Sequence, residues 1–264
     1  MSLIIERSKI FTQVIDSCKF ILKHDKIAAS AKEYLDSRIS QSLQDKYDFG
    51  FFPKDYNLQY LSSLVDISDL KKFNIIYNKH INNNLILSGH FSQHNLIMPF
   101  KDVHGNIVSI LGRTLLSEAE QKDKAIQKYK YTIGADKELY VYGLNEAVPS
   151  ILEKDYVICV EGQFDFIRCK EMGLDNVVAL GWARLSKFQF FQISKYTTNI
   201  YLMLDNDDAG RKGKEMAKKR FKDYANIKTI SIPKGFKDID EFIKNNKNNK
   251  MCDIVINRLK NMHL

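Results

Sequence analysis

Two stretches decide the predicted fold: VICVEGQFD, from Val157 to Asp165, and IYLMLDNDDAG, from Ile200 to Gly210. Each begins with a short apolar run rich in β-branched or aromatic residues, as is typical of a buried strand. Acidic side chains follow each run directly, just before a predicted helix. The carboxyl ends of the strands in an open parallel sheet form the edge where ligands bind. Carboxylates repel one another, so a cluster of them at this edge indicates a hard divalent cation.

Strands and helices alternate through the carboxyl-terminal part of the chain. Strands are predicted near residues 157–160, 177–180, 200–204 and 228–232, and helices near 163–172, 186–195, 209–222 and 238–246. This alternation predicts a mainly parallel central sheet flanked by helices, which is an α/β fold. We assign this domain to residues 151–245, followed by a short helix within 246–264.

Residues 1–150 have a different pattern, which predicts a mixed α+β subdomain. Apolar residues recur at helical spacing over 3–22, and a second helix is predicted near 28–35. Two apolar runs, 95–100 and 106–111, flank a turn and predict a hairpin. The run Asn82–Asn84 is typical of another hairpin tip or loop.

Three pairs of acids are predicted at strand ends: Glu161 with Asp165, Asp205 with Asp207, and Asp238 with Asp240. In a parallel sheet these ends can converge on one edge. Such a cluster can hold Mg²⁺ through a few carboxylates and water, which leaves positions for phosphate oxygens. Two ions held in this way would support in-line phosphoryl transfer. Glu161 stands apart from the Asp pairs and is the candidate to assist proton removal from an attacking hydroxyl.

The acids also have a purely structural interpretation. An Asp at the start of a helix often only caps it, and this applies most directly to Asp165 and Asp208. A single Asp-x-Asp would more readily be structural than catalytic. The recurrence of acids after three apolar strands favours a metal site.

Three motifs resemble the Toprim domain: Glu161-Gly162-x-x-Asp165, Asp205-x-Asp207-x-Ala209-Gly210 and Lys237-Asp238-x-Asp240-Glu241. Further segments resemble the RNA polymerase core of DnaG-type bacterial and phage primases. They are AKEYLDSR at 31–38, FGF at 49–51, MPFKD at 98–102, Gly112-Arg113, Lys130-Tyr131, and Lys137 ahead of YGLNEA at 142–147. The resemblance covers nearly the whole chain, from about residue 8 to residue 245.

The resemblance implies a DNA-directed RNA polymerase, a nucleotidyltransferase that makes RNA primers on single-stranded DNA from nucleoside triphosphates. It implies that Glu161, Asp205 and Asp207 are catalytic. It also implies a set of acids that holds two or more Mg²⁺ or Mn²⁺ ions: Glu161, Asp165, Asp205, Asp207, Asp238 and Asp240. Residues 1–150 would then supply residues that face the template and the incoming nucleotide: Arg113, Lys130, Tyr131 and Lys137.

The chain has a formal net charge of +8, which permits a polyanionic partner. Residues 211–237 contain ten Lys or Arg and two acids, a net of 10 − 2 = +8. We expect Arg211 and Lys212 near phosphate, because a helix amino terminus favours anions. The more distal lysines of this helix are expected to form a solvated face.

The expected partners follow from the resemblance. They are a single-stranded DNA template, nucleoside triphosphates, the RNA–DNA hybrid product, a replicative helicase and a separate zinc module. Four scattered cysteines form no CxxC pair, so no zinc is expected in this chain. No stretch reaches membrane-spanning length and residues 1–22 do not form a secretory signal, so we expect a cytoplasmic protein. The resemblance implies a place in the nucleoid-associated replication machinery.

Two positions depart from the primase pattern. The family commonly has an Arg where this chain has Gln93, His94 and Asn95, and a small hydroxyl residue where it has Trp182. Trp182 could stack on a base, or it could anchor a loop. Two alternative functions use the same features: a Toprim-type nuclease with the same acids, and a non-catalytic single-strand-binding accessory. The intact acidic set argues against the accessory, because carboxylates without metal would repel a phosphate backbone.

Overall fold

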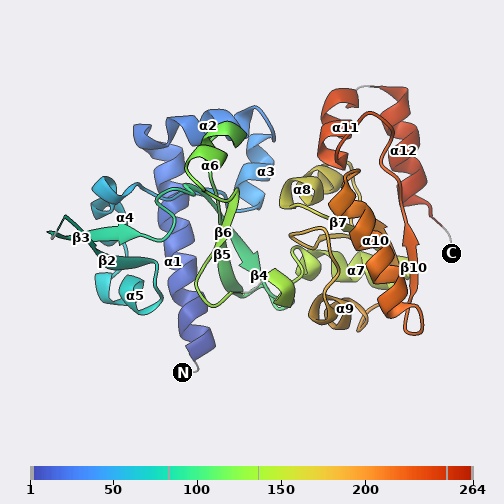
Figure 1. The fold of residues 1–264 in the computed structure, drawn as a ribbon, viewed down its shortest axis with the longest axis horizontal. Helices are drawn as coiled ribbons and strands as arrows, with labels where there is room; N and C mark the ends of the chain where they lie inside the picture. The colour runs from blue at the N-terminus through green and yellow to red at the C-terminus, as the bar shows by residue number, and fades with distance from the viewer. Residues whose placement is uncertain (1–2, 83, 136, 248, 263–264) are drawn as a thin grey trace. The chain divides into compact units, whose positions relative to one another are not determined.

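The structure is a computed structural model that describes residues 3–82, 84–135, 137–247 and 249–262 (Figure 1). Its contacts divide the chain into two compact units. The amino-terminal unit is Met1–Lys101 with Asn106–Ala135, and the carboxyl-terminal unit is Asp102–Gly105 with Asp136–Leu264. Residue 150 lies inside helix α7 (Leu144–Lys154), which packs into the core of the carboxyl-terminal unit. The domain assignment made from the sequence stays a prediction. None of the described helices is long and apolar enough to cross a lipid bilayer.

The carboxyl-terminal unit is built on a parallel sheet with the strand order β10-β9-β7-β8. The strands are β7 (Val157–Val160), β8 (Val177–Ala179), β9 (Asn199–Met203) and β10 (Asn226–Thr229). A single antiparallel bridge joins Tyr142 to Ala179. The helices after α7 are α8 (Gln163–Glu171), α9 (Lys187–Ile193), α10 (Asp208–Phe221), α11 (Ile239–Asn246) and α12 (Lys250–Lys260). The predicted α/β fold with a mainly parallel sheet is confirmed.

The sheet is buried on both faces. One core joins side chains of α7, α9 and α10 to alternate residues of β7 and β9, such as Cys159 and Leu202. The intervening residues of β7, Ile158 and Val160, are also fully buried, so they pack on the opposite side. Helix α8 packs against β8, and α11 packs on α8. A sheet covered in this way exposes its strand ends rather than its faces, so it presents side chains at its edge.

The last strand is not where the sequence predicts it. Strand β10 covers 226–229, whereas the apolar pattern predicts 228–232. β10 pairs with β9 alone among the described strands, in a register that sets Asn226 opposite Asn199. Most of its side chains are exposed, so hydrophobicity does not mark it. Ile232, the apolar residue that suggests a later strand, is buried outside the strand.

The amino-terminal unit packs α1 (Leu3–His24) on an antiparallel sheet with the order β1-β4-β5-β6. The strands are β1 (Gly50–Phe51), β4 (Leu96–Lys101), β5 (Ile107–Arg113) and β6 (Tyr129–Tyr131). The predicted hairpin of β4 and β5 is confirmed, as is the predicted mixed α+β character. The core joins α1 residues such as Phe11 and Val14 to Ile97 and Ile110 of the sheet.

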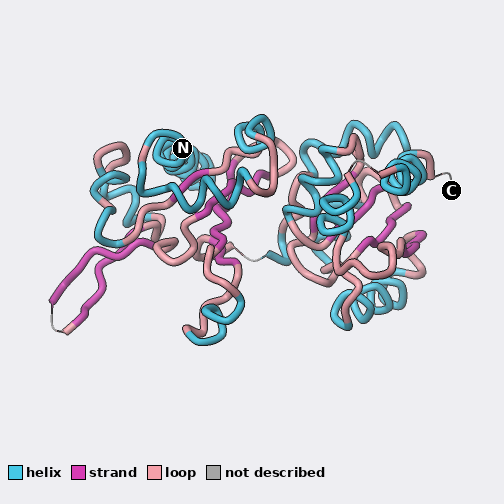
Figure 2. The backbone as a smooth tube through the Cα atoms, turned by 90° about the horizontal axis from the view of Figure 1, so that it is seen from above, coloured by secondary structure: helices cyan, strands magenta, loops and turns pink. Residues whose placement is uncertain are grey.

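A second hairpin, β2 (Ile76–Ile81) with β3 (Asn84–Gly89), projects from the rest of this unit (Figure 2). Asn82 lies in the turn, and Asn83 lies outside the described residues. The short helices are α2 (Ala29–Asp36), α3 (Gln41–Lys46), α4 (Gln59–Ser62), α5 (Ile67–Lys72) and α6 (Glu118–Asp123).

Two glycines let α10 approach the loops at the carboxyl edge of the sheet. A Cβ atom on Gly210 would lie 2.2 Å from the carbonyl oxygen of Asp205, and one on Gly213 would lie 1.7 Å from that of Ala183. Both distances are far below van der Waals contact. Any larger residue would therefore push α10 away from the loops that carry Asp205 and Ala183.

We expect Gly213→Ala to destabilise the protein by at least about 1 kcal/mol. Alanine would normally stabilise a helix by about 0.5–1 kcal/mol relative to glycine. Here the clash with Ala183 should outweigh that gain, because overpacking typically costs about 1–3 kcal/mol. The measurement is urea unfolding, with Lys212→Ala on the exposed side of the same helix as the control. A Gly213→Ala protein as stable as the wild type would contradict the close approach of α10.

Candidate metal centre and nucleic-acid interface

The acidic residues lie where the strands end and the next helices begin. Glu161 follows β7 directly, and Asp205 and Asp207 follow β9. Because β7 and β9 are adjacent parallel strands, these three residues leave the sheet at neighbouring points. Asp165 lies in the first turn of α8, and the remaining two acids lie at the start of α11.

The acids fall into two groups that Asp205 links. The outer group is Glu161, Asp205 and Asp207, because the two aspartates raise the pKa of Glu161 by charge repulsion. The inner group is Asp165, Asp238 and Asp240. Burial, and then repulsion from Asp238, raises the pKa of Asp165, whereas the backbone N–H of Asp240 lowers it and the Asp240 charge raises it. Asp205 also raises the pKa of Asp165. The structure thus brings all six sequence-predicted acids into electrostatic contact.

Backbone N–H groups fix three of these carboxylates. Asp207 Oδ1 accepts from Gly210 N–H at 2.8 Å, and Asp238 Oδ1 accepts from Glu241 N–H at 2.7 Å. Asp165 Oδ2 accepts from Gly162 N–H at 2.9 Å. Asp207 and Asp238 are the N-caps of α10 and α11, whereas Asp165 lies in the first turn of α8 and bonds back to the N-cap residue, Gly162. Asp208, the other acid considered as a cap, begins α10 and is exposed. These contacts fix the position of each carboxyl group.

Glu161 has a buried oxygen without a partner. Within the described residues, no protein group donates a hydrogen bond to its Oε2 atom. Burial, and then repulsion from Asp205 and Asp207, raises the pKa of Glu161 to about 7. Burial also raises the pKa of Asp165 well above its usual range. Buried polar atoms normally have partners, so the free oxygen points to a ligand that the protein alone does not supply.

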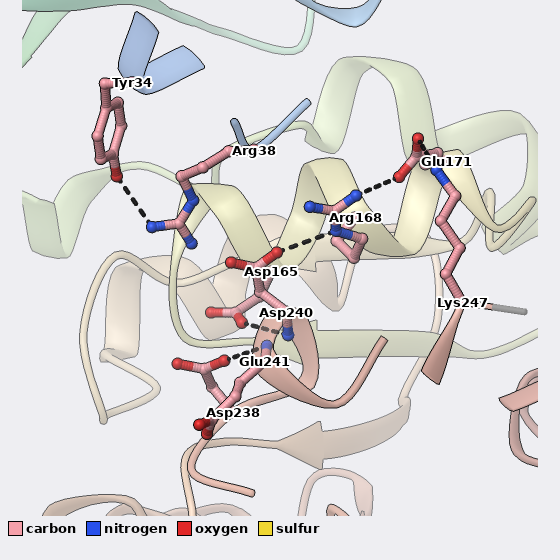
Figure 3. Close-up of polar contacts among 9 residues, drawn as sticks. All are labelled: Tyr34, Arg38, Asp165, Arg168, Glu171, Asp238, Asp240, Glu241 and Lys247. Atoms are coloured by element: carbon pink, nitrogen blue, oxygen red, sulfur yellow. Dashed lines mark hydrogen bonds and ion pairs between the residues drawn. The ribbon is translucent and has the colours of Figure 1, made fainter. Parts of the chain in front are cut away.

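A buried arginine holds the inner group (Figure 3). Arg168 Nε donates to Asp240 Oδ1 at 3.0 Å, and its Nη1 donates to Glu171 Oε2 at 2.5 Å. The Asp240 N–H donates to Asp165 Oδ1 at 3.2 Å. Lys247 completes the network through Glu171 at 2.8 Å. Nothing in the sequence pairs Arg168 with Asp240, although its position three residues after Asp165 places both on one side of α8.

The donor set fits a hard divalent cation. Carboxylate oxygens are the ligands that Mg²⁺ and Mn²⁺ prefer, and Glu161 Oε2 is available. No group of three or more His, Cys, Asp or Glu side chains in the described parts of the chain already has metal-site geometry. Burial, and then repulsion from neighbouring acids, raises the pKa of Glu161 and of Asp165, and a divalent cation would relieve both costs.

The carboxyl-terminal unit also carries cations at this edge. Arg211 forms an ion pair with Asp208 and donates to the Asn206 carbonyl at 3.0 Å, and it is exposed, as is Lys212. Lys214 was not singled out in the sequence. It is only 9% exposed, and its charge interacts with Asp205 and Glu161. Lys214 lies seven residues, or about two helical turns, after Asp207, so both are on one face of α10. This spacing could have identified Lys214 from the sequence.

In the amino-terminal unit, Arg113 lies at the end of β5 directly opposite Tyr129. Its Nη1 donates to the Tyr129 hydroxyl at 2.7 Å, and its guanidinium lies 5.1 Å from the ring centre of Tyr34. Arg38 lies against the same Tyr34 ring and donates to its hydroxyl at 2.9 Å (Figure 3). The sequence did not single out Tyr34 and Tyr129 as site residues. Together they hold two guanidinium groups against aromatic rings.

Lys130 does not join this cluster. It lies between Tyr129 and Tyr131 in β6, and alternation in a strand points it to the opposite face. There its charge helps to lower the pKa of His90 and His94, for which burial is the main cause. Because side chains alternate between the two faces of a strand, the sequence Tyr-Lys-Tyr could have predicted that Lys130 lies on the face opposite its two neighbours. Lys137 lies in the other unit, in a 3-10 helix (Lys137–Leu139).

Comparisons with known proteins agree on one family. A family model described as Toprim-like matches residues 158–243. The DNA primase of Aquifex aeolicus is 28% identical over 246 residues, which are 89% of this chain and 46% of that protein. The DNA primase of Synechococcus elongatus is 32% identical over 156 residues, which are 56% of this chain and 22% of that protein. The chain therefore spans less than half the length of these curated relatives.

Two solved structures have the same fold over nearly the whole chain. The zinc-binding and RNA polymerase domains of the Aquifex aeolicus primase match with a TM-score of 0.77 and 26% identity, over 97% of this chain and 60% of that one. A DnaG primase catalytic domain bound to single-stranded DNA matches with a TM-score of 0.72 and 21% identity, over 95% of this chain and 80% of that one.

The raised pKa of Glu161 predicts a pH-dependent effect of Glu161→Gln without divalent cations. A carboxyl whose folded-state pKa is raised favours folding below its ordinary pKa near 4.5 and loses that contribution as the pH rises through about 7. We expect Glu161→Gln to become more stable than the wild type, by about 1–2 kcal/mol at pH 8 after allowance for solvent screening. Urea unfolding with a chelator at pH 5 and pH 8 measures this. Glu215→Gln, whose side chain is 75% exposed, is the control. A stability difference that does not change with pH would refute the assignment.

Arg168→Leu should destabilise the protein by about 3–5 kcal/mol, because it removes one partner of a buried ion pair with Asp240. Lys247→Met, which removes the half-exposed outer member of the network, should cost less than about 1 kcal/mol. Adding Asp240→Asn to Arg168→Leu should recover part of the loss. Chemical unfolding of the four proteins tests this, and equal costs for Arg168→Leu and Lys247→Met would disprove the structural role of Arg168.

Proposed function

We propose that this chain, a relative of the RNA polymerase domain of DnaG-type DNA primases with a Toprim-like carboxyl-terminal unit, is a primase catalytic core. It would join nucleoside triphosphates into short RNA primers on a single-stranded DNA template. The observation that carries the proposal is the outer acidic group, Glu161, Asp205 and Asp207, at the ends of two adjacent parallel strands. Its buried, unpartnered Glu161 oxygen supports a cation site there.

The outer group, with Asp238, would hold two or more Mg²⁺ or Mn²⁺ ions. Bound there, the ions would neutralise charge on the transferring phosphoryl group and promote ionisation of the attacking hydroxyl. Glu161 is the proposed residue that assists proton removal, because it ends β7 and stands apart from the Asp pairs. Asp165 and Asp240 are engaged by Gly162 N–H and by Arg168, so we assign them to holding the inner side of the site.

We assign nucleic-acid and nucleotide binding to cations in both units. In the amino-terminal unit, Arg113 is braced by Tyr34 and Tyr129, which supports contact with a phosphate backbone or a stacked base. Tyr131 lies on the same face of β6 as Tyr129 and would contribute to this surface, whereas Lys130 points to the opposite face, and its role in binding stays a separate prediction. In the carboxyl-terminal unit the candidates are Lys137, Arg211 and Lys212, the last two at the amino terminus of α10.

The proposed partners are those of the related primases. The DNA ligand of the DnaG catalytic domain is the basis for a single-stranded template here, with an RNA–DNA hybrid as product. We also propose a replicative helicase and a separate zinc module, and a place in the cytoplasmic, nucleoid-associated replication machinery. A Toprim nuclease would use the same acids, so synthesis and cleavage must be assayed together.

We expect Asp205→Asn to reduce metal-dependent primer synthesis by at least about 100-fold, because the Asp205 charge acts on both Glu161 and Asp165. Asp208→Asn is the matched control, since this acid begins α10, three residues further on, and its side chain is 84% exposed; it should keep activity within about twofold. The assay uses labelled single-stranded DNA with Mg²⁺ or Mn²⁺, with and without nucleoside triphosphates. Cleavage in place of synthesis would favour the nuclease, and full activity of Asp205→Asn would refute the acid assignment.

A further inference from the structure

We infer that Trp182 is a positioning residue that holds Lys137 and Arg184 as a paired binding site for a phosphate group at the catalytic edge. The inference rests on the proposed function, because it assigns a ligand to that same edge. It concerns one short turn, residues 181–184, that follows β8.

The turn is fixed to the acidic site. Gly181 N–H donates to the Glu161 carbonyl oxygen at 2.8 Å, so the turn and the catalytic glutamate share a backbone bond. On its other side, the carbonyl of Ala183 lies against Gly213 of α10. Trp182 therefore has a defined position between the end of β7 and the start of α10.

Two cations lie against the Trp182 indole. The Lys137 ammonium is 4.9 Å from the ring centre, and the Arg184 guanidinium carbon is 5.6 Å from it. Neither cation forms an ion pair with a carboxylate of the described chain. The ring holds both through cation–π attraction. Two cations held beside one ring form a site for an external anion, although Glu138 lines the same pocket.

The backbone of Lys137 is held as firmly as its side chain. Gln189 of α9 is fully buried, and its Nε2 donates to the carbonyls of Lys137 at 3.1 Å, Tyr140 at 2.9 Å and Leu180 at 2.7 Å. The Ser186 hydroxyl donates to the Glu138 carbonyl at 2.6 Å. Leu180 lies between β8 and the turn. The side-chain amide of Gln189 therefore bonds both to the segment that carries Lys137 and to the segment that leads to Trp182.

The contacts of Trp182 favour the loop-anchor interpretation over stacking on a base. The ring packs, partly buried, against the core of this unit, and two cations lie against it. A phosphate oxygen is the anion that a primase reaction brings to this edge, either in the triphosphate of a nucleotide or in the backbone of a strand. Both sources share one chemistry, and the experiment separates them.

Trp182 is the single tryptophan of the chain, so its fluorescence reports on this site alone. Inorganic tripolyphosphate represents the nucleotide, and a short oligothymidylate represents the strand. With Mg²⁺ present, we expect a saturable change in emission on adding one of them, because phosphate draws the cations from the ring. Lys137→Met and Arg184→Met should abolish the change. Lys187→Met, an exposed cation near the same turn, should keep it.

The probe that changes the emission identifies the source of the phosphate: tripolyphosphate indicates a nucleotide, and oligothymidylate indicates a strand. If calorimetry detects nucleotide binding but neither probe changes the emission, the inference is overturned. If the emission responds but the protein makes no primers, the proposed function fails while the phosphate site stands.

Kinetics provide a second test. Trp182→Leu should raise the KM for the phosphate donor about tenfold and leave kcat within about twofold, since the ring orients the cations and does not touch the reacting atoms. Trp182→Phe keeps an aromatic face and should restore most of the affinity. Leu and Phe variants that both behave like the wild type, or both lose kcat equally, would show that the indole only packs the turn.

Discussion

The repulsion between carboxylates gathered at one edge of a parallel sheet is the constraint on which the rest of the structure depends. The strands force the acids together, because β7 and β9 are neighbours and end side by side. Backbone N–H groups at helix starts hold Asp165, Asp207 and Asp238 against that repulsion. The caps stabilise each carboxylate singly, and the raised pKa of Glu161 shows that repulsion remains among the group.

Close packing of α10 connects the acids to their surroundings. Gly210 and Gly213 allow the helix to touch the backbone of Asp205 and Ala183. Because the helix lies so near, its second turn buries Lys214 on the side of the acids. The same contact fixes the turn that carries Trp182. One helix position therefore sets the locations of an acid, a buried cation and an aromatic side chain.

The sequence locates strands, and the acids that follow them, where the buried residues of a strand form an apolar run. The strands β7, β8 and β9 are fully apolar runs, so their ends and the acids that follow them could be located. Strand β10 could not, because an exposed edge strand has no apolar signal. The contact of Arg168 with Asp240 joins residues far apart in the chain, and no local pattern encodes it. The partnership of Arg113 with Tyr129 and Tyr34 likewise depends on strand register and on packing.

The two acidic groups differ in which protein groups balance their negative charge. The inner group has its own buried counter-ion, Arg168, bonded directly to Asp240. In the outer group, Lys237 acts on Glu161 by charge, and Lys214 interacts in the same way with Glu161 and Asp205. Glu161 keeps a buried oxygen to which no described protein group donates. A buried polar atom without a partner is costly, so Glu161 is the acid of this edge that gains most from a ligand. Asp165 and Asp240 of the inner group are already fixed by a backbone N–H group and by Arg168, so the two groups differ most at Glu161.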